Sequence, residues 1–560
     1  MTKGLPRSLE HSNTIVTKVS GNSVTVTSVE ELQAKYNSLA SATWDKTMGA
    51  VSALNQRRLI LPAGNYGNVV LRANTPNVLA VPMQPGSITR LVISTTPSVD
   101  LTGATTVSTV SQLRAAIGYW DDSGGSRVAG SADGGTIYIV AGNYGLGATD
   151  NILYPAKNTN VVGAGMDLVT ITGRLFAKQS AATDKIVLED FSVDINGNVA
   201  IPGSNLPATS AYGGSIVEDG RYEFNRVHVT NSAVTAGKNN FTSLDDGIKT
   251  VVVMNDCIVD YAEDDCVSVK STSTKQAGTT LRAYNCRFTD PGSSISDQAI
   301  TPHNDIPVHV VDCILTNTTT DGFAAAGATE TDLLYLYNCY ITGAVTKVAV
   351  AIGNHVDGQS LTDYAVKMSQ DVDTYCVGNY IKGGTLARAI YCGGGSAAEK
   401  SYVLSNIIDE VGTGTSGTGV EVRAGTDVGN VYINNNYVKS AYRGIDVREC
   451  DGIPEIRNNI VDVPAGSGHY VILGISGAHS KNNVFPDINT VSTHTLDATD
   501  VNEPADIDSD YVPTVGGNCD GTGDATADIS REIDRLGNLR KWKSTICIGP
   551  IEIPQGVVTI

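Results

Sequence analysis

One short phrase of amino acids returns over and over between residue 187 and the end of the chain. Each copy has alternating β-branched or aromatic residues, then Asn or Asp, a small or amide residue, and two more β-formers, as at 187–193, 223–229 and 253–259. Most copies follow one another after 23 to 30 residues. A fixed period of this size means that each copy is one supersecondary unit stacked on its neighbours.

One slot of the phrase defines the register of the repeat. It holds Phe191, Val227, Cys257, Cys286, Cys313, Cys339, Asn379, Asn406, Asn436, Asn459 and Asn483. The period contains strands and turns without a helical pattern, which excludes helical repeats and leaves a parallel β-helix. Equivalent residues on successive rungs of this fold lie about 4.8 Å apart, so like side chains pack or hydrogen-bond along the axis. The sequence therefore predicts an inward-pointing ladder that changes from thiols to amides.

The overall charge limits the partners of the chain. Asp and Glu number 58 among 560 residues against 39 Lys and Arg, a formal charge of −19. Such a surface repels nucleic acids and anionic membranes, so we expect neither as a partner. Residues 1–8 lack the apolar core of a secretory signal and no apolar run reaches membrane-spanning length. We therefore expect a soluble protein that stays in a cytoplasm or is released without a signal peptide.

The cysteines are expected to be structural. Four of them occupy one slot of the repeat, and a column of like thiols has a packing explanation, so we expect reduced, buried side chains. The sequence contains no Cys-x-x-Cys motif and no Cys/His cluster. We therefore expect no bound metal and no cofactor.

Two segments near the start of the chain repeat each other. Residues 26–32 match 107–113, and residues 59–67 match 137–145. In both copies Ser or Thr stands three residues before Glu or Gln, which predicts a helix N-cap. The capping pairs are Ser28 with Glu31 and Thr109 with Gln112, and the apolar residues at helical spacing are Val29, Leu32, Tyr36 and Leu39, then Val110, Leu113, Ile117 and Trp120. Each copy predicts a short amphipathic helix, then a strand, then a Gly-Asn-Tyr-Gly turn.

These end motifs resemble those of a known family. The entry pattern, Thr/Ser-Val-x-x-Leu and then Ile-x-Leu-Pro-Ala-Gly-Asn-Tyr, looks like that of pectin-lyase-like right-handed β-helix proteins, where a helix caps the open end. The ending, Asp-x-x-Gly-x-x-Arg at 534–540 and Gly-x-x-Glu at 549–552, is similar to the closing coil of many bacterial and phage β-helix proteins. The resemblance implies an all-β, single-stranded right-handed parallel β-helix over 101–490. A module at 1–100, either a first cap or a virion adapter, precedes it, and an acidic loop and closing coil follow at 491–560.

The richest acidic segments are Ser-Leu-Asp-Asp-Gly-Ile at 243–248 and Glu-Asp-Asp-Cys-Val-Ser at 263–268. They resemble the polygalacturonase motifs Asn-Thr-Asp-Gly-Ile and Asp-Asp-Cys-Ile-Ala, whose acids hydrolyse a glycosidic bond. The resemblance puts Asp246 in the place of the first acid, and Asp264 and Asp265 in the places of the second pair. The family's Gly-His-Gly element is replaced at 294–305 and its Arg-x-Lys is not evident. Hydrolysis, β-elimination and binding alone all remain open.

A register argument supports the same acids. Four of them open similar strand phrases: Asp246, Asp265, Asp297 and Asp321. We expect these four to line one edge of successive coils, where rung spacing approaches the roughly 5 to 9.5 Å that separates glycosidase carboxyls. Asp264 and Asp265 are neighbours in the sequence and would point to opposite faces of a straight strand. Both therefore act at one site only if the chain bends there. The competing interpretation is that Asp-Gly at a strand entrance is ordinary turn chemistry.

Substrate contacts are expected from four residues. His303 with Asp305 has the composition of a base and its orienter, and Lys270 is suited to neutralise a uronate carboxylate. Asp321 would extend the acidic edge. The alternative for each is an ordinary solvated polar residue.

Together these patterns predict a phage tailspike-like virion protein that binds a host-surface or extracellular polysaccharide and depolymerises it, as a glycoside hydrolase or polysaccharide lyase. A long groove of turns and aromatic residues suits an extended glycan. The resemblance further implies a homotrimer, and the N-terminal module is expected to contact other virion proteins. Two alternatives remain, a non-enzymatic structural or receptor-binding virion fibre and a free extracellular polysaccharide lyase or hydrolase from a bacterium.

Overall fold

The computed structural model describes residues 101–484 with internal gaps, five strands before them, Val99, and a few positions beyond. The gaps of five residues or more are 196–213, 233–238, 292–296, 318–322, 327–333, 394–398, 424–429, 449–453 and 474–478, and the later positions are 499, 505–507, 518–519, 523 and 549–550. The five early strands are β1 (Ser23–Thr25), β2 (Arg57–Leu61), β3 (Gly64–Val70), β4 (Val78–Pro82) and β5 (Ile88–Ser94). In this described part, no helix is long and apolar enough to span a bilayer.

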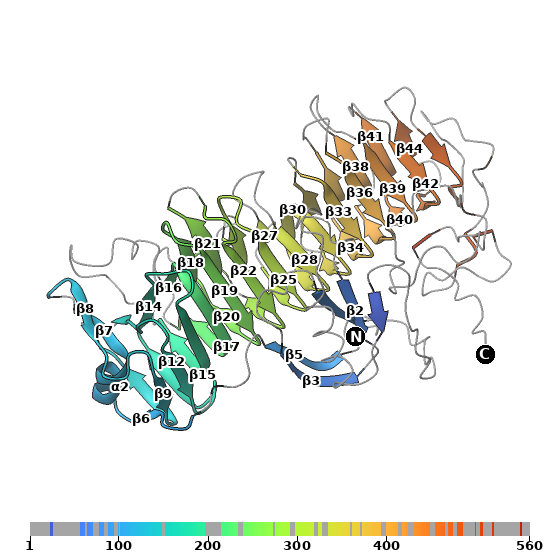
Figure 1. Cartoon of the computed structure of the whole chain (residues 1–560). Helices are drawn as coiled ribbons and strands as arrows, with labels where there is room; N and C mark the ends of the chain where they lie inside the picture. Colours follow the sequence, from blue (N-terminus) through green and yellow to red (C-terminus); the bar gives the residue numbers. More distant parts are fainter. Residues whose placement is uncertain are drawn as a thin grey trace. The chain divides into compact units, whose positions relative to one another are not determined.

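The chain divides into two compact units. The first unit comprises residues 67–73 and 91–334, and the second unit comprises residues 1–66, 74–90 and 335–560. From residue 105 onward the described strands of each unit form a parallel β-helix, apart from one hairpin at 118–129, and strands β1–β5 form two small separate sheets (Figure 1). The predicted fold class is therefore confirmed. The predicted domain boundaries near 100 and 490 stay predictions, because most residues beyond them lie outside the described part.

Each coil of the first unit has three strands, which we call A, B and C in chain order. In one coil they are β19 (Thr250–Asn255), β20 (Ile258–Asp260) and β21 (Val267–Ser271), and in the next β22 (Thr280–Tyr284), β23 (Arg287–Thr289) and β24 (Ile300–Pro302). Every strand pairs in parallel with its counterpart one coil later. The same pattern includes β6 (Thr105–Val107), β9 (Thr136–Ile139), β10 (Gly142–Gly145), β12 (Asn160–Gly163), β13 (Val169–Thr172), β14 (Arg174–Lys178), β15 (Lys185–Asp194), β16 (Ser215–Glu218), β17 (Gly220–Thr230), β18 (Phe241–Asp245), β25 (Val308–Val311), β26 (Ile314–Thr316) and β27 (Phe323–Ala326).

The second unit repeats this three-strand coil from β28 onward. Its strands are β28 (Leu334–Tyr337), β29 (Tyr340–Thr342), β30 (Ala344–Ile352), β31 (His355–Asp357), β32 (Tyr364–Met368), β33 (Thr374–Val377), β34 (Tyr380–Gly384), β35 (Arg388–Cys392), β36 (Ser401–Leu404), β37 (Ile407–Val411), β38 (Thr418–Arg423), β39 (Val431–Asn434), β40 (Tyr437–Ser440), β41 (Arg443–Arg448), β42 (Glu455–Arg457), β43 (Ile460–Asp462), β44 (His469–Leu473) and β45 (His479–Lys481). Near its end, the backbone N–H of Gly549 donates to the carbonyl of Asn458 at 2.9 Å. This contact places one residue of the predicted closing coil against a rung; most of that segment lies outside the described residues.

A left-handed corner separates each A strand from its B strand and explains the repeated phrase. The residue before each ladder slot has φ between 52° and 67°, and most of these residues are Asn, Asp or Gly, which adopt this conformation at least cost. Arg226 is an exception, and the bonds of its guanidinium offset the cost of the left-handed conformation. Its Nε and Nη2 atoms donate to the two carboxylate oxygens of Asp190 on the preceding corner, at 2.6 and 2.8 Å.

The ladder slot points inward, as predicted. Every residue assigned to it is buried, from Phe191 to Asn483. In the first unit the backbone N–H of Cys257 donates to Sγ of Cys286 at 3.4 Å, and that of Cys286 donates to Sγ of Cys313 at 3.2 Å. The four predicted ladder cysteines are free thiols, which confirms that expectation.

The amide part of the ladder contains one residue that the sequence reading missed. Asn354 lies between Cys339 and Asn379, and its Oδ1 accepts the backbone N–H of Cys339 at 2.8 Å. The coil from Cys339 to Asn354 is short because β30 runs through as one continuous strand without a loop. From Asn354 to Asn483 each side-chain oxygen accepts from the preceding rung, for example from both nitrogens of Asn379 to Asn406 at 3.0 and 2.9 Å.

One predicted capping helix lies within the described residues. Helix α2 (Val110–Ile117) begins at Thr109, whose hydroxyl accepts the backbone N–H of Gln112 at 3.2 Å, and it buries Leu113, Ala116 and Ile117. Trp120 lies beyond the helix, in β7 (Gly118–Asp121), which pairs with β8 (Ser126–Ala129). The Gly-Asn-Tyr-Gly segments form strands β3 and β10, so their assignment as turns was wrong. The first predicted helix, near 28–39, falls outside the described residues.

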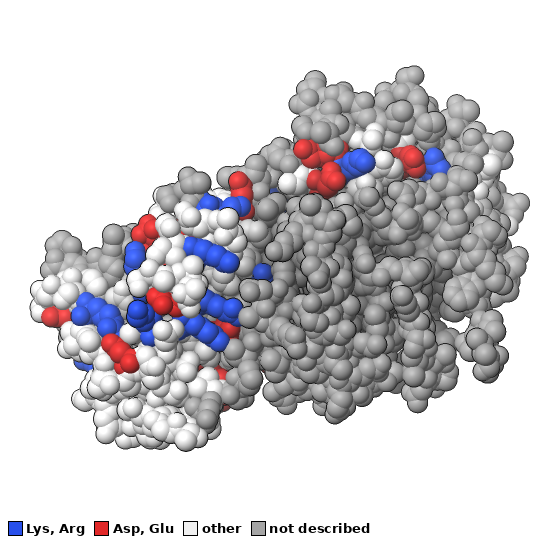
Figure 2. Space-filling view, viewed as in Figure 1, with Lys and Arg blue, Asp and Glu red and all other residues white. Residues whose placement is uncertain are grey.

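Basic and acidic side chains are interspersed on the described surface of the first unit (Figure 2). The carboxylate of Glu223 is fully buried and receives ion pairs from Lys185 at 2.9 Å and Arg221 at 2.8 Å. Glu189, also buried, is paired with Arg226. These pairs offset the desolvation of the buried carboxylates, so the net charge of −19 does not form a uniform acidic coat there.

Candidate active site

Polar side chains gather on the outer face of the C strands of the first unit. Phe241 of β18 packs edge-to-face on Phe224 inside the helix, with ring centroids 5.2 Å apart, so Thr242 points outward. Strand register then defines two outward rows across successive coils. The first row is Phe176, Ile216, Thr242, Ser268 and Thr301, and the second is Lys178, Glu218, Leu244, Lys270 and His303. The first row is buried, and in the second row Lys178, Lys270 and His303 have exposed surface. We call this side of the C strands the C face.

The register separates the two acids that the sequence paired. Asp245, at the end of β18, lies opposite Ser271, at the end of β21, so Asp246 comes after its strand. Asp265 instead comes two residues before β21. A five-residue strand spans about 16 Å, well beyond the roughly 5 to 9.5 Å of a glycosidase pair. The predicted common edge of Asp246 and Asp265 was wrong, because one phrase leaves a C strand and the other enters it.

Asp297 instead joins Asp264 and Asp265. Val267 lies opposite Ile300, and the N–H of Cys266 donates to the carbonyl of Gln298 at 2.9 Å, so the segment that enters β21 runs beside the segment that enters β24. Asp297 directly precedes Gln298, whose N–H bonds to Oδ1 of Asp265. The backbone bends at residues 263–264. This bend is the condition under which the adjacent Asp264 and Asp265 can act at one site. We call Asp264, Asp265 and Asp297 the acid cluster. Lys270 and His303 lie at the other end of these strands, in the row of Lys178 and Glu218, and the charge of Lys270 acts on Asp265 from there.

Asp265 is the most perturbed carboxyl of the cluster. Only 6% of the residue is exposed, and Oδ1 accepts the backbone N–H of Gln298 at 3.0 Å. Burial and the neighbouring charge of Asp264 raise the pKa of Asp265 to about 7, against the opposing hydrogen bond from Thr301. A carboxyl with this pKa retains its proton near neutral pH, which suits a general acid.

Lys270 and His303 occupy adjacent rungs of the second outward row. Burial, with a smaller contribution from the charge of Lys270, lowers the pKa of His303 to about 4, so the imidazole is neutral at pH 7. Its Nε2 atom is buried and has no hydrogen-bond partner among the residues that the structure describes, so Asp305 does not orient it through that atom. The carbonyl of Asp305 accepts a hydrogen bond from Nζ of Lys275 at 2.5 Å.

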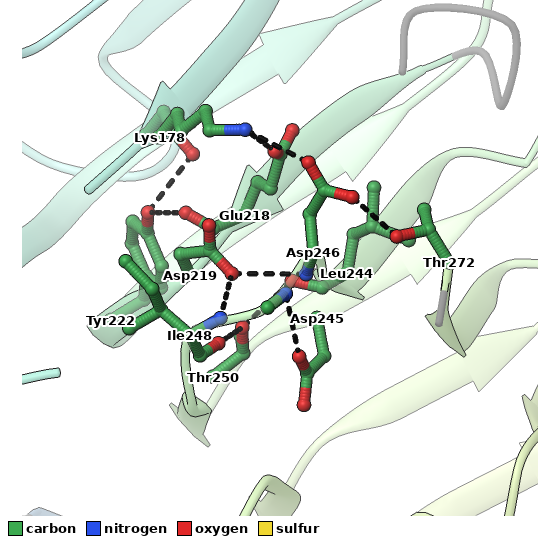
Figure 3. Close-up of polar contacts among 12 residues, drawn as sticks. Lys178, Glu218, Asp219, Tyr222, Leu244, Asp245, Asp246, Ile248, Thr250 and Thr272 are labelled. Carbon is green, nitrogen blue, oxygen red and sulfur yellow. Dashed lines mark hydrogen bonds and ion pairs between the residues drawn. The ribbon is translucent and has the colours of Figure 1, made fainter. Parts of the chain in front are cut away.

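Asp246 belongs to a second group at the other end of the C strands, which we call the lysine-bridged cluster (Figure 3). Nζ of Lys178 lies 3.0 Å from Oδ2 of Asp246 and is also paired with Glu218, whose side chain is almost fully buried. Asp246 accepts a further bond from the hydroxyl of Thr272. The hydrogen bonds from Thr272 and Lys178 lower the pKa of Asp246, so this carboxylate is ionised at neutral pH. Desolvation lowers the pKa of Lys178, but its bonds to Glu218 and Asp246 outweigh that effect and raise it.

Turn chemistry holds the lysine-bridged cluster in place. The carboxylate of Asp219 accepts the backbone N–H groups of Asp246 and Ile248 at 2.9 and 3.1 Å (Figure 3). Asp245 is fully buried and accepts from the hydroxyl of Thr279 at 2.6 Å. Asp219 and Asp245, which the sequence did not single out as candidates, therefore act as turn formers here. Desolvation raises the pKa of Asp219.

Sequence reasoning missed Lys178 and Glu218. A signal was present for Glu218, because Glu-Asp-Gly at 218–220 repeats the Asp-Asp-Gly of 245–247. Lys178 carried no such signal. Asp321 lies outside the described residues, so its predicted place on the acidic edge stays a prediction. A search of the described residues finds no group of three or more His, Cys, Asp or Glu side chains placed to hold a metal ion.

Comparisons with known proteins add little beyond the geometry. No family model and no curated relative matches the chain. The catalytic unit of a thermostable GH87 alpha-1,3-glucanase from Streptomyces thermodiastaticus strain HF3-3 is 13% identical over 73% of this chain and 70% of its own, with a TM-score of 0.35. The A-modules of the Azotobacter vinelandii mannuronan C-5 epimerases AlgE6 and AlgE4 are 13% and 12% identical over 63% and 67% of this chain and 91% and 99% of theirs, each with a TM-score of 0.36. At these scores the likenesses support no argument, and the fold assignment rests on the strand pairing itself.

Proposed function

We propose that the chain binds a polysaccharide on the C face of the first unit and hydrolyses its glycosidic bonds. The observation that carries the proposal is the acid cluster. It combines a buried carboxyl, Asp265, whose pKa is raised to about 7, with Asp264 beside it and Asp297 on the neighbouring rung. Glycoside hydrolysis requires this combination of one protonated and one ionised carboxyl at close range.

The residues of the cluster suit distinct roles. Asp265 would donate its proton to the leaving glycosidic oxygen, held in position by the N–H of Gln298. Asp297 or Asp264 would activate water or attack the sugar from the other side. Burial, and after it the charge of Asp264, raises the pKa of Asp265. The neutral His303, at the other end of the C strands, would hydrogen-bond sugar hydroxyls.

The charge balance of the cluster favours hydrolysis over β-elimination. Lyase chemistry on a uronate needs cations that neutralise the substrate carboxylate, the role predicted for Lys270. Lys270 lies at the far end of β21 from Asp264 and Asp265, so it is not placed to neutralise a carboxylate bound beside them. A uronate carboxylate entering this group of three acids would meet repulsion from any charge they carry, whereas an uncharged sugar would not.

Depolymerisation of surface polysaccharides tests the proposal. A panel of bacterial polysaccharides is incubated with the wild-type protein and with Asp265→Asn, and product size is measured by size-exclusion chromatography. We expect wild-type cleavage without unsaturated ends, and a loss of at least about 100-fold in Asp265→Asn, the usual worth of a positioned proton donor. The matched control is Asp167→Asn, an exposed acid of the same unit, which should cleave at the wild-type rate.

Two outcomes would contradict the proposal. Glycan binding without any change in chain length would favour the non-enzymatic alternative, and products with unsaturated ends would favour a lyase. Cleavage by Asp265→Asn at the wild-type rate would remove Asp265 from the chemistry.

The biological setting is a further part of the proposal. The resemblance of the end motifs to phage β-helix proteins supports a tailspike-like virion protein, assembled as a homotrimer, that acts on a host-surface or extracellular glycan. Mass spectrometry of purified virions would detect the chain if it is a virion component. Its recovery only as free protein in the culture medium would favour the alternative of a secreted bacterial enzyme.

A further inference from the structure

Aromatic side chains form the end of the C face that lies farthest from the acid cluster. Trp120 and Tyr154 are half-buried, with ring centroids 6.1 Å apart and planes tilted by 30°. Tyr154 packs edge-to-face on Phe176 at 4.9 Å. Phe176 is buried with Ile152 and Ile216 in a small apolar cluster outside the main core, against which Trp120 and Tyr154 pack. These contacts hold the two partly exposed rings in fixed positions.

The aromatic end adjoins the lysine-bridged cluster. Leu153 of β11 (Ile152–Leu153) lies opposite Leu175, so Tyr154 falls opposite Phe176, and Lys178 follows two residues later on the same face. Desolvation and, to a smaller extent, the charge of Glu218 raise the pKa of Tyr154 to about 12. Rings and hydrogen-bonding groups therefore lie within one or two rungs of each other.

This combination matches the two-sided chemistry of a sugar ring. The C–H face of a pyranose packs on aromatic surface, and its hydroxyls need donors and acceptors in fixed positions. Lys178 supplies a donor and Asp246 an acceptor, and both side chains are more than a third exposed. Thr272 and the almost fully buried Glu218 hold Asp246 and Lys178 in place. Lys178 and Asp246, which would contact a ligand, are thus held in position by Glu218 and Thr272, which would not contact it.

The charges of the cluster select the kind of sugar. Lys178 is bridged by two carboxylates, Glu218 and Asp246, and the nearby Arg127 is paired with Asp133 at 2.6 Å. The bridge therefore carries an excess of one negative charge and repels the carboxylate of a uronate. An uncharged sugar carries no such penalty.

We infer that Trp120, Tyr154, Lys178 and Asp246 form a binding subsite for an uncharged sugar residue of the glycan, separate from the acid cluster. The inference rests on the proposed function for its ligand class. Strands β14, β16, β18 and β21 are successive rungs, so Lys178 is about 14 Å from the rung of Asp265 along the axis, and Asp246 is separated from Asp265 by the length of a C strand. An extended chain of several sugars would reach both.

Binding to a glycan array tests the subsite apart from catalysis. The array carries uncharged and uronate-containing oligosaccharides, and the protein is Asp265→Asn, so that bound glycan is not turned over. We expect uncharged oligosaccharides to bind preferentially. The best-bound of them is then titrated against Trp120→Ala, which should lose at least about tenfold in affinity, and Trp120→Phe, which should retain most of it. Tyr340→Ala, at a 45% exposed tyrosine of the second unit, is the matched control and should bind unchanged.

A second variant addresses charge selection and protects the test against misfolding. Asp246→Asn removes one charge from the lysine-bridged cluster and should narrow the preference for uncharged over uronate-containing oligosaccharides, with thermal unfolding showing an intact fold. Wild-type affinity in both Trp120→Ala and Asp246→Asn would overturn the subsite, even if the wild-type protein depolymerises the glycan. A uronate preference, or no binding to any uncharged oligosaccharide, would also overturn it. Loss of binding in Trp120→Ala without any depolymerisation by the wild type would support the subsite and refute the proposed hydrolysis.

Discussion

The two units fill the same inside corner with different chemistry. In the first unit the slot holds Phe191 and Val227 and then three thiols, and the backbone N–H groups of Cys257 and Cys286 donate to the sulfur of the next rung at 3.4 and 3.2 Å, a weak acceptor. In the second unit the slot holds amides that use their full capacity. Asn406, for example, accepts two bonds from Asn379 and donates from Nδ2 to the carbonyl of Cys376 at 2.8 Å and to Asn436 at 3.0 Å.

The difference shows that a repeat constrains the shape of a slot more strongly than its chemistry. Both side chains are small enough for the corner, and both follow a left-handed residue. A thiol behaves as a small apolar group and tolerates loss of its weak bonds. A buried amide does not, because each unpaired polar group bears its full desolvation cost. The first unit also differs on its outside, since it carries the acid cluster.

The largest expected effect comes from Asp265, the buried carboxyl of the first unit. Its pKa is raised when folded, so its contribution to stability is fully present below about pH 4 and is lost as pH rises through about 7. The free energy of unfolding should fall by up to about 4 kcal/mol across that window from this group alone. Urea unfolding at pH 5 and pH 8 should show this dependence in the wild type and much less of it in Asp265→Asn. Identical pH dependence in the two proteins would mean that the carboxyl is not perturbed.

The amide ladder gives the next largest effect. Asn436→Leu removes the acceptor of the backbone N–H of Asn406 and of one of its side-chain N–H bonds, and a donor to two carbonyls, and should lower the free energy of unfolding by about 1–3 kcal/mol. Denaturant unfolding measures this loss. Lys439→Gln, at a 40% exposed side chain three residues later, is the control and should change stability by less than about 0.5 kcal/mol. A neutral Asn436→Leu would remove the distinction between the two columns.

The thiol ladder should be the least sensitive. Cys286→Ala removes one weak N–H···S bond and a small volume, so we expect a loss of about 1 kcal/mol, below that of Asn436→Leu. The same unfolding measurement ranks the two variants. A larger loss in Cys286→Ala than in Asn436→Leu would reverse the comparison.

The sequence predicted the fold and the inner column because both depend on a pattern that repeats in every coil. Cys257 and Asn436 were assigned to one inward slot, and the structure confirms it. Asn354 was missed because its coil has only 15 residues, from Cys339 to Asn354, outside the expected period. The three acids of the acid cluster, Asp264, Asp265 and Asp297, were all named as candidates, as were Lys270 and His303 at the other end of their strands.

Pairing among those candidates could not be derived from the sequence alone. Asp-Gly at 246–247 and Asp-Cys at 265–266 look alike locally, yet one follows a C strand and the other precedes it. Loop lengths vary from coil to coil, so counting residues does not give the register between C strands. Glu218 was missed for the same reason, although its Glu-Asp-Gly phrase was visible.

By itself the sequence determined the period, the left-handed corners and the inward ladder, because each is a local preference repeated many times. Only the tertiary structure decided which acids meet, where Lys178 bridges Glu218 and Asp246, and why Asp265 retains its proton to about pH 7. Those outcomes depend on strand register across loops and on burial by distant segments. Strand register and burial both depend on residues from the whole coil, so no single phrase of the sequence determines either of them.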